Sequence, residues 1–413
     1  MKKQILLLAL GMFTVASFAQ KNELKAAEKA IKKLDFSAAV AAINSAEGLI
    51  ANADAKTKSK FYFLKGQAFG GKKEYEKAGK AYKDLFDFEK SSGKKRYTDK
   101  ALPMFSLLKD EVNNKAFQLN DVENFKESSK AFYLRYTLDK KDTLYLSNAA
   151  QLASRAKDID VSLKYYRELV RLGYQGIETD YFATNISTGK EEPFSSKSLR
   201  DFSIKGKTHN NPIDKKTTSK RAGIFNSIST ILAGQNKFDE AVVAIKKARE
   251  IDSNKLDYLM NEAQLYIKMN KMDLFGGMME EAILKDPTNP ILYFNLGVVN
   301  YNENKLEEAK KYYLKAIELK PDYDDAILNL AIAILTKEKA IIEEMNNNLS
   351  NNKKYDALEK QQKEVYKEAL PYLEKADSLK RTKETVQRLL NIYEVLEMEE
   401  KAKVFRVLYR ELR

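Results

Sequence analysis

The chain has 413 residues, 44% of them hydrophobic, and a formal net charge of +13 at pH 7. It contains no cysteine and one histidine, which excludes a disulfide framework, a thiolate metal site and a zinc site of the usual ligand types. Stability must therefore come from packing, and a chain of this size and composition can bury a continuous core.

The charge is unevenly distributed along the chain. Residues 1–220 hold 41 Lys and Arg against 27 Asp and Glu, a net charge of +14, whereas residues 221–413 hold 31 against 32, a net charge of −1. The basic half could face an acidic partner or an anionic polymer, but lysines spread over exposed helix faces are also ordinary solvation. Both interpretations stay open at this stage.

Residues 1–19 have the pattern of a secretory signal peptide. Two lysines precede an uncharged run, and Ser17 and Ala19 provide the small residues of a cleavage site before Gln20. The apolar run of about 15 residues is shorter than the ~20 that a spanning helix needs, so we expect cleavage rather than a membrane anchor. We therefore expect an exported protein, periplasmic or associated with the outer envelope, that does not span the membrane after cleavage and has no nucleic-acid ligand.

Residues 20–173 repeat weakly at a spacing of 34. Ala116 and Ala150 are separated by this spacing, and so are Ser128 and Ser162. A fixed period of this length is typical of a helix-turn-helix solenoid, so we expect about four such units here.

One interval in this half is longer than the period. The separation of Ala78 and Ser128 exceeds one repeat by nearly half a period, and the surplus falls in the polar stretch EKSSGKKRYTDK, residues 89–100. Its composition predicts a surface loop.

Residues 174–221 show no helical period. The stretch TDYFATNISTGKEEPF alternates in polarity and turns at Thr188 and Gly189, which predicts a β-hairpin within an otherwise irregular insertion. Insertions of this length are usually functional or disordered. The single histidine, His209, lies here, and we expect a solvent-exposed side chain rather than a catalytic one.

Residues 222–335 carry the clearest repeats. Asparagine recurs once in each period at Asn236, Asn270 and Asn304, and alanine recurs at the same interval at positions 248, 282 and 316. Small residues let two antiparallel helices approach closely, and such a hairpin cannot bury its apolar face alone, so the units must stack.

The segment 290–323 resembles the tetratricopeptide repeat family. The matching positions carry a large residue, a Leu-Gly pair, two alanines, an aromatic residue and a terminating proline: Tyr293, Leu296, Gly297, Ala309, Tyr313, Ala316 and Pro321. The resemblance implies an all-α fold, a right-handed α-solenoid of helix-turn-helix repeats. Within it we expect the mid-chain β-containing insertion and a long projecting helical hairpin.

That hairpin is predicted for residues 336–366. The alanine that matches Ala309 in the next unit, Ala369, comes about three-quarters of a period later than one repeat would place it, and strong helix formers flank the turn NNNLSNN. The simplest interpretation lengthens both helices of the unit by about 13 residues, which would form an arm roughly 20 Å long at 1.5 Å per residue. Residues 367–413 then form a degenerate repeat and a capping helix.

The sequence offers no convincing catalytic or cofactor site. The stretch GQAFGGK, residues 66–72, nearly matches a phosphate-binding loop, but Lys73 stands where the magnesium-binding hydroxyl belongs, and Gly66 is explained as the small residue of a helix crossing. We therefore expect no catalytic residue, no cofactor and no metal.

The resemblance implies a partner-binding groove lined by the first helix of each repeat. The positions that line it in the family are Asp257, Met260, Gln264 and Ile267 in one unit, and Ile291, Phe294, Val298 and Tyr301 in the next. The version of the family that clamps terminal carboxylates uses Lys or Arg and Asn here, and Met260, Gln264, Phe294 and Val298 depart from that pattern. An apolar groove instead suits a peptide or an amphipathic helix, unless neighbouring coils of the solenoid cover it.

These observations favour a non-enzymatic protein–protein interaction scaffold of the bacterial cell envelope. The alternative is that the basic N-terminal half binds an anionic envelope polymer or lipid headgroups. An enzyme with its site in residues 174–221 is a third, weaker hypothesis.

Overall fold

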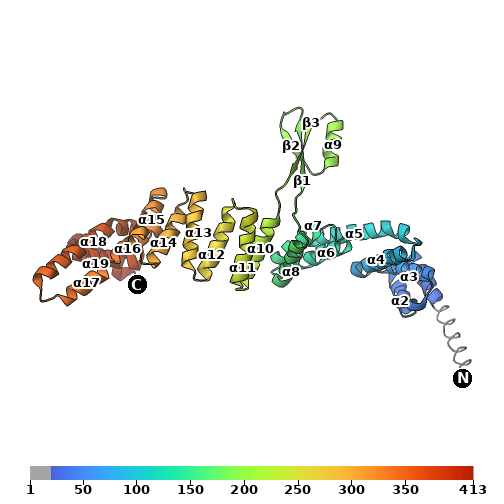
Figure 1. Ribbon diagram of the computed structural model, residues 1–413, viewed down its shortest axis with the longest axis horizontal. Helices are drawn as coiled ribbons and strands as arrows, with labels where there is room; N and C mark the ends of the chain where they lie inside the picture. Colours follow the sequence, from blue (N-terminus) through green and yellow to red (C-terminus); the bar gives the residue numbers. More distant parts are fainter. Residues whose placement is uncertain (1–19, 413) are drawn as a thin grey trace, which may run out of the picture. The chain divides into compact units, whose positions relative to one another are not determined.

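The computed structural model describes residues 20–412, so the expected signal peptide, 1–19, lies outside the described residues. The chain divides into two compact units, one ending at Lys220 and the other beginning at Arg221. Both units are built from antiparallel helix pairs, which confirms the predicted all-α solenoid (Figure 1).

The first unit holds four helix pairs before its insertion. Its first described helix, 20–32, is followed by α2 (Phe36–Glu47) and the short 3-10 turn η1 (Ile50–Asn52). The remaining pairs are α3 (Ala55–Gly71) with α4 (Tyr75–Ser92), α5 (Thr98–Asp121) with α6 (Phe125–Leu138), and α7 (Leu144–Arg155) with α8 (Ile159–Arg171).

The second unit continues the pattern as a row of stacked helices (Figure 1). Its regular pairs are α10 (Arg221–Gly234) with α11 (Phe238–Ile251), α12 (Leu256–Lys268) with α13 (Met272–Lys285), and α14 (Pro290–Asn302) with α15 (Leu306–Leu319). The chain ends with α16 (Asp324–Leu335), α17 (Glu338–Asn347), α18 (Asn352–Leu379), α19 (Lys383–Val395) and α20 (Glu399–Glu411).

The repeated asparagines mark the turns inside the helix pairs. Asn236, Asn270 and Asn304 have φ values of 59°, 55° and 60°, in the left-handed region that asparagine tolerates better than most residues. In each turn the next backbone N–H returns to a carbonyl of the preceding helix, as Lys305 N does to Asn300 O at 2.8 Å. This bond pattern closes the first helix and reverses the chain.

Close approach within a pair depends on the small residues. A Cβ atom built on Gly297 would lie 2.4 Å from the Tyr313 ring, and one on Gly66 would lie 2.5 Å from the Tyr82 ring. The stretch GQAFGGK, residues 66–72, which resembles a phosphate-binding loop, lies almost wholly in α3. Its Gly66 packs against the ring of Tyr82 from α4.

The polar stretch 89–100 is not the predicted loop. Most of it belongs to α4 and α5, and only residues 93–97 between them are non-helical. Glu89, which is 1% exposed, accepts hydrogen bonds from the backbone N–H groups of Arg96, Tyr97 and Thr98 at 2.8, 3.0 and 3.0 Å. A carboxylate in α4 thus caps the beginning of α5, and the surplus residues lengthen the two helices.

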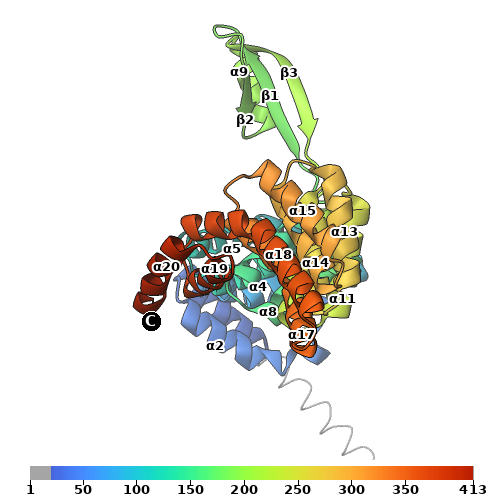
Figure 2. The same cartoon turned by 90° about the vertical axis from the view of Figure 1, so that its left-hand side faces the viewer.

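The insertion contains more regular structure than its sequence predicts. The expected hairpin is present as β1 (Thr179–Asn185) and β2 (Glu191–Phe194), but α9 (Lys197–Lys205) and β3 (His209–Lys216) follow. The three strands pair antiparallel in the order β2-β1-β3, and α9 packs beside them (Figures 1 and 2). The predicted β-containing insertion is confirmed, and the expectation that the rest of it is irregular is wrong.

The helical hairpin of residues 336–366 differs in one respect from its prediction. The second helix, α18, is long, with 28 residues, but the first is interrupted after Leu335 and resumes as α17. At the break the Thr336 hydroxyl donates to Ile332 O at 3.0 Å. Ile341, Met345 and Leu358 form a small separate core that packs α17 on α18.

None of the helices within residues 20–412 combines the length and the apolar character needed to cross a bilayer.

Candidate functional site

The predicted groove residues lie on α12 and α14, the first helices of two successive pairs. Asn289 caps α14 by accepting from Ile291 N at 3.1 Å, and Pro290 begins the helix. On these helices Ile267 is 40% exposed and Ile291 is 52% exposed. Asp257 and Gln264 are also exposed.

The other four predicted residues are only half-buried: Met260, Phe294, Val298 and Tyr301. The Phe294 ring lies 6.0 Å from the Tyr313 ring and 5.2 Å from the Tyr323 ring, centroid to centroid. The Tyr301 hydroxyl donates to the Thr336 hydroxyl oxygen, 3.3 Å away. Phe294 and Tyr301 therefore hold one helix pair against the next, in addition to any contact with a ligand.

The exposed residues lie on α12 and α14, which like α10 are the first helices of successive pairs. A polar contact joins the neighbouring first helices α10 and α12, since Asn261 Nδ2 donates to Asn226 Oδ1 at 2.8 Å. We call Asp257, Gln264, Ile267 and Ile291 the first-helix face. It has an exposed isoleucine near the end of α12 and another near the beginning of α14, with a carboxylate and an amide exposed on α12.

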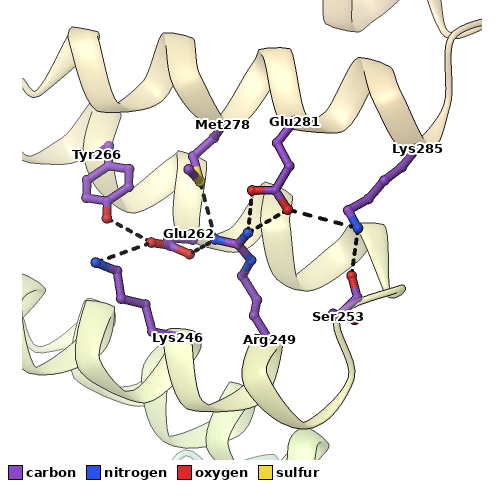
Figure 3. A network of polar contacts seen from close by, with 8 residues as sticks. All are labelled: Lys246, Arg249, Ser253, Glu262, Tyr266, Met278, Glu281 and Lys285. Carbon is purple, nitrogen blue, oxygen red and sulfur yellow. Dashed lines mark hydrogen bonds and ion pairs between the residues drawn. The ribbon is translucent and has the colours of Figure 1, made fainter.

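A polar network fixes α12 against its neighbours (Figure 3). Glu262 in α12 is 1% exposed, and its carboxylate is bound by Arg249 from α11 and accepts from the Tyr266 hydroxyl at 2.8 Å. Arg249 also donates to both carboxylate oxygens of Glu281 in α13, at 2.7 and 2.6 Å. The ion pairs therefore join three consecutive helices.

The surroundings keep Arg249 charged and the Tyr266 hydroxyl protonated. Burial opposes the charge on Arg249, but its hydrogen bonds to Glu262 and Glu281 outweigh that effect and raise its pKa. Burial and the bond to Glu262 raise the pKa of Tyr266 to about 12. The network thus positions α12 and does not resemble an acid–base site, in which a proton must leave or arrive near neutral pH.

The sequence contained a signal for this network that the repeat pattern did not use. Glu262 stands one repeat period before Leu296, at a position where the clearest repeat carries leucine. A charged residue at a core position predicts a buried partner. Arg249 could not be identified as that partner from the spacing alone.

His209 differs from its prediction, because its side chain is 11% exposed rather than open to solvent. Its Nε2 lies 3.0 Å from Glu192 Oε2, and its Nδ1 lies 2.9 Å from the Thr208 hydroxyl. Glu192 is in β2 and His209 is in β3, so the contact ties the two outer strands of the sheet together. Within residues 20–412, no group of three or more His, Asp or Glu side chains is placed to hold a metal ion.

A cavity of about 460 Å³ lies among α2, α3 and α4. Four lysines line it, and ion pairs join Lys65 to Glu47, Lys77 to Glu74 and Lys80 to Asp84. Because carboxylates within the cavity compensate these ammonium groups, the lining does not select a charged ligand.

Comparison with known proteins locates the similarity in the repeats. Residues 290–323 match the family model of the tetratricopeptide repeat. A probable UDP-N-acetylglucosamine–peptide N-acetylglucosaminyltransferase, SPINDLY of Solanum lycopersicum, is 30% identical over 106 residues, which are 26% of this chain and 11% of that protein. The human protein O-mannosyl-transferase TMTC3 is 23% identical over 229 residues, which are 50% of this chain and 25% of that protein.

Two solved structures are similar in part. The C-terminal part of a TPR repeat-containing protein from Cytophaga hutchinsonii has a TM-score of 0.47 at 15% identity, covering 72% of this chain and 94% of that one. YrrB, a TPR protein with an unusual peptide-binding site, has a TM-score of 0.35 at 14% identity, covering 52% of this chain and 87% of that one.

Proposed function

We propose that this protein is a non-enzymatic scaffold that binds a segment of a partner protein on the first-helix face. The observation that carries the proposal is the pair of exposed isoleucines, Ile267 and Ile291, on adjacent first helices of a tetratricopeptide repeat array. Covering an exposed apolar side chain removes its surface from water, which favours binding of a partner. Repeats of this family are protein-interaction modules, which supports the same function.

The chemistry of the face indicates the kind of segment it takes. Two branched apolar side chains provide burial, and Asp257 and Gln264 provide polar contacts at their margin. The segment would be an amphipathic helix or an extended peptide with apolar side chains at a matching spacing. A terminal carboxylate finds no lysine or arginine among these residues.

The test is a double variant that changes only exposed side chains. Ile267→Lys with Ile291→Lys should abolish capture of the partner by the full chain after cross-linking in cells, because charges would enter the apolar contact. The half-buried Phe294 is unsuitable, since its ring packs against Tyr313 and Tyr323.

The matched control places the same charges on second helices. Leu284 in α13 is 85% exposed and Leu314 in α15 is also exposed, so Leu284→Lys with Leu314→Lys should retain the partner. If both variants retain the partner, the first-helix face is not its binding site. If both variants lose the partner, binding is not specific to that face.

The proposed location is the bacterial cell envelope, after export and removal of residues 1–19. The support is the charge and apolar pattern of that segment, followed by small residues before Gln20. Cell fractionation with N-terminal sequencing tests it. A cytoplasmic chain that begins at Met1 would refute the location while leaving the scaffold function open.

A second candidate function is binding of an anionic envelope polymer or lipid headgroups by the first unit. The observation in its favour is that the change in charge coincides with the boundary between the units, since residues 1–220 carry 41 basic and 27 acidic residues. Long-range attraction of this kind is sensitive to salt.

A further inference from the structure

The outer face of α9 exposes large apolar side chains to solvent. The helix packs on the sheet through Arg200, which is buried and pairs with Asp214 of β3. Two residues further along, and so on the far side of the helix, Phe202 is 75% exposed, the highest value for a phenylalanine within residues 20–412. Leu199 is 54% exposed, and residues three apart on a helix are neighbours, so the two side chains form one apolar patch.

Two lysines extend this face. Lys205 follows Phe202 by the same interval of three, and Lys207 lies in the turn after the helix. Both are exposed, and neither forms an ion pair within the described part of the chain. Asp201, the carboxylate one turn before Lys205, binds Arg200 at 3.0 Å instead. The two ammonium groups therefore have no carboxylate partner beside the apolar patch.

The turn between β1 and β2, residues 186–190, lies beside the end of α9. Ile186 N donates to Thr208 O at 3.0 Å, and Thr208 N donates to Ser203 O of α9 at 3.2 Å. The turn adds an exposed isoleucine, Ile186, and an exposed lysine that forms no ion pair among the described residues, Lys190. Apolar and basic side chains therefore gather around the end of α9.

These side chains define the α9 surface, made up of Ile186, Lys190, Leu199, Phe202, Lys205 and Lys207. Its two kinds of group match the two layers of a bilayer surface, where anionic headgroups overlie an apolar interior. Lysines can lay their stems along the apolar layer and reach the phosphates with their ammonium groups. A soluble anionic polymer would meet the lysines and leave the Phe202 ring in water, so the apolar patch favours lipid.

We propose that the α9 surface binds the face of an anionic lipid bilayer. Phe202 and Leu199 enter the boundary between headgroups and acyl chains, and Lys205 and Lys207 contact the headgroup phosphates. This site goes beyond the scaffold function of the second unit. It rests on the second candidate function, to which it gives a binding surface and a ligand class.

The test introduces a fluorophore at the centre of the surface. The chain contains no tryptophan, so the emission of Phe202→Trp reports on this position alone. The protein used begins at Gln20, because the apolar run before that residue would bind vesicles by itself, and it contains every helix and strand of the described structure. It is mixed with vesicles of phosphatidylcholine alone or of equal parts phosphatidylcholine and phosphatidylglycerol. We expect emission to move to shorter wavelength with the anionic vesicles only, because the indole leaves water for the headgroup boundary.

Phe117→Trp is the matched control for position. Phe117 is an exposed phenylalanine in α5 of the same unit, so this variant should show no change in emission with either kind of vesicle. A shift of both tryptophans would mean that the first unit binds lipid without a preferred face, which would overturn the proposal. No shift of Phe202→Trp, or an equal shift with neutral and anionic vesicles, would overturn it as well.

A second pair of variants tests the charges in the Phe202→Trp background. Lys205→Glu with Lys207→Glu should lower the apparent affinity for the anionic vesicles by roughly tenfold or more. The matched control is Lys94→Glu with Lys95→Glu, which changes the net charge equally at two exposed lysines of the same unit and should keep the affinity within about twofold. Equal losses by both would assign binding to the overall charge of the unit and reject the α9 surface, while the second candidate function would stand.

An apolar variant keeps the proposal testable if the charge variant fails to fold. Leu199→Ser with Phe202→Ser should no longer sediment with anionic vesicles but should still be retained on immobilised dextran sulfate, a soluble polymer that offers no apolar layer. Vesicle binding that survives in this variant would reject the α9 surface. An original chain that binds dextran sulfate and ignores vesicles would refute the α9 surface alone, and one that ignores both would refute the second candidate function too. Loss of a cross-linked protein from this variant, without vesicle binding by the original chain, would make the surface a protein-docking site instead.

Discussion

Glu89 shows how much one buried carboxylate can organise. Besides the three backbone N–H groups at the start of α5, it accepts from the Thr98 hydroxyl at 2.8 Å. Burial alone would raise its pKa, but the hydrogen bonds from Thr98, Arg96 and Ser59 outweigh burial and lower the pKa below its ordinary value of 4.5. The ionised form is therefore the one that stabilises the turn.

The sign of this pKa shift predicts a pH dependence. A lowered pKa in the folded state gives stability that is complete above the ordinary value of 4.5 and is lost as pH falls through the folded value. Glu89→Gln should therefore cost about 1.5–3 kcal/mol at pH 7, the range for hydrogen bonds to a charged group, and progressively less in acid. Urea unfolding at pH 7 and in mild acid measures it, and a cost that does not change with pH would contradict the role of the charge.

Gly297 permits a second prediction at the scale of a residue. Gly297→Ala forces a methyl group against the Tyr313 ring, and overpacking of this kind typically costs about 1–3 kcal/mol. Gly277 in α13 is the matched control, because a Cβ there meets nothing within 4 Å. Gly277→Ala should be neutral or should stabilise by up to about 1 kcal/mol through helix propensity. Equal effects of the two substitutions on denaturant unfolding would refute the close crossing.

At the scale of elements, the ion-pair network joins α11, α12 and α13 more specifically than apolar packing does. Removing one partner of a buried ion pair leaves the other charge buried and unpaired. Arg249→Met should therefore lower the free energy of unfolding by about 3–5 kcal/mol. Adding Glu262→Leu, which restores the residue type of Leu296, should recover most of that loss. Chemical unfolding of the two variants checks this, and additive losses would show that the residues do not act as a pair.

The turns between paired helices show what the sequence could and could not predict about the elements. The recurring asparagines Asn236, Asn270 and Asn304 marked the repeat period, and the structure places all three at turns in the left-handed conformation that asparagine tolerates. Other turns place Leu34, Lys73 and Glu123 in that conformation, with φ values of 58°, 60° and 57°, and these residue types carry no such signal. Local preference therefore identified the regular pairs more clearly than the degenerate ones.

Tertiary contacts account for most of the remaining errors. The stretch 89–100 has the composition of a loop, and it became the ends of two helices because the Glu89 carboxylate of α4 caps α5. The helix is likewise interrupted where the Thr336 hydroxyl meets that of Tyr301 from α14, in a segment of strong helix formers. Composition describes residues one at a time and so misses both contacts.

The candidate site was predicted less completely than the fold. Repeat positions identified helices α12 and α14, and the structure exposes Asp257, Gln264, Ile267 and Ile291 there. The repeat pattern could not show that Phe294 and Tyr301 also pack against the next helix pair. Phe294 contacts Tyr323, just before α16, and Tyr301 contacts Thr336, just after it.

For the whole molecule, the division of charge predicts where an anionic polymer would bind. Retention of the full chain on such a polymer should fall steeply with added salt, and hydrogen exchange should slow within 20–220 while residues from Arg221 onward stay unchanged. Retention that is insensitive to salt, or protection only in the second unit, would reject this second candidate function.

The sheet of the insertion affects how copies of this protein behave at high concentration. Its outer strands, β2 and β3, each contain a proline, Pro193 and Pro212, and neither residue has a backbone N–H to offer a neighbouring chain. The pairing of β3 with β1 is also irregular, with a register shift between Phe182 and Thr184. A crowded population of these molecules thus lacks a continuous template for fibril growth, and the small sheet can remain solvated without seeding aggregation.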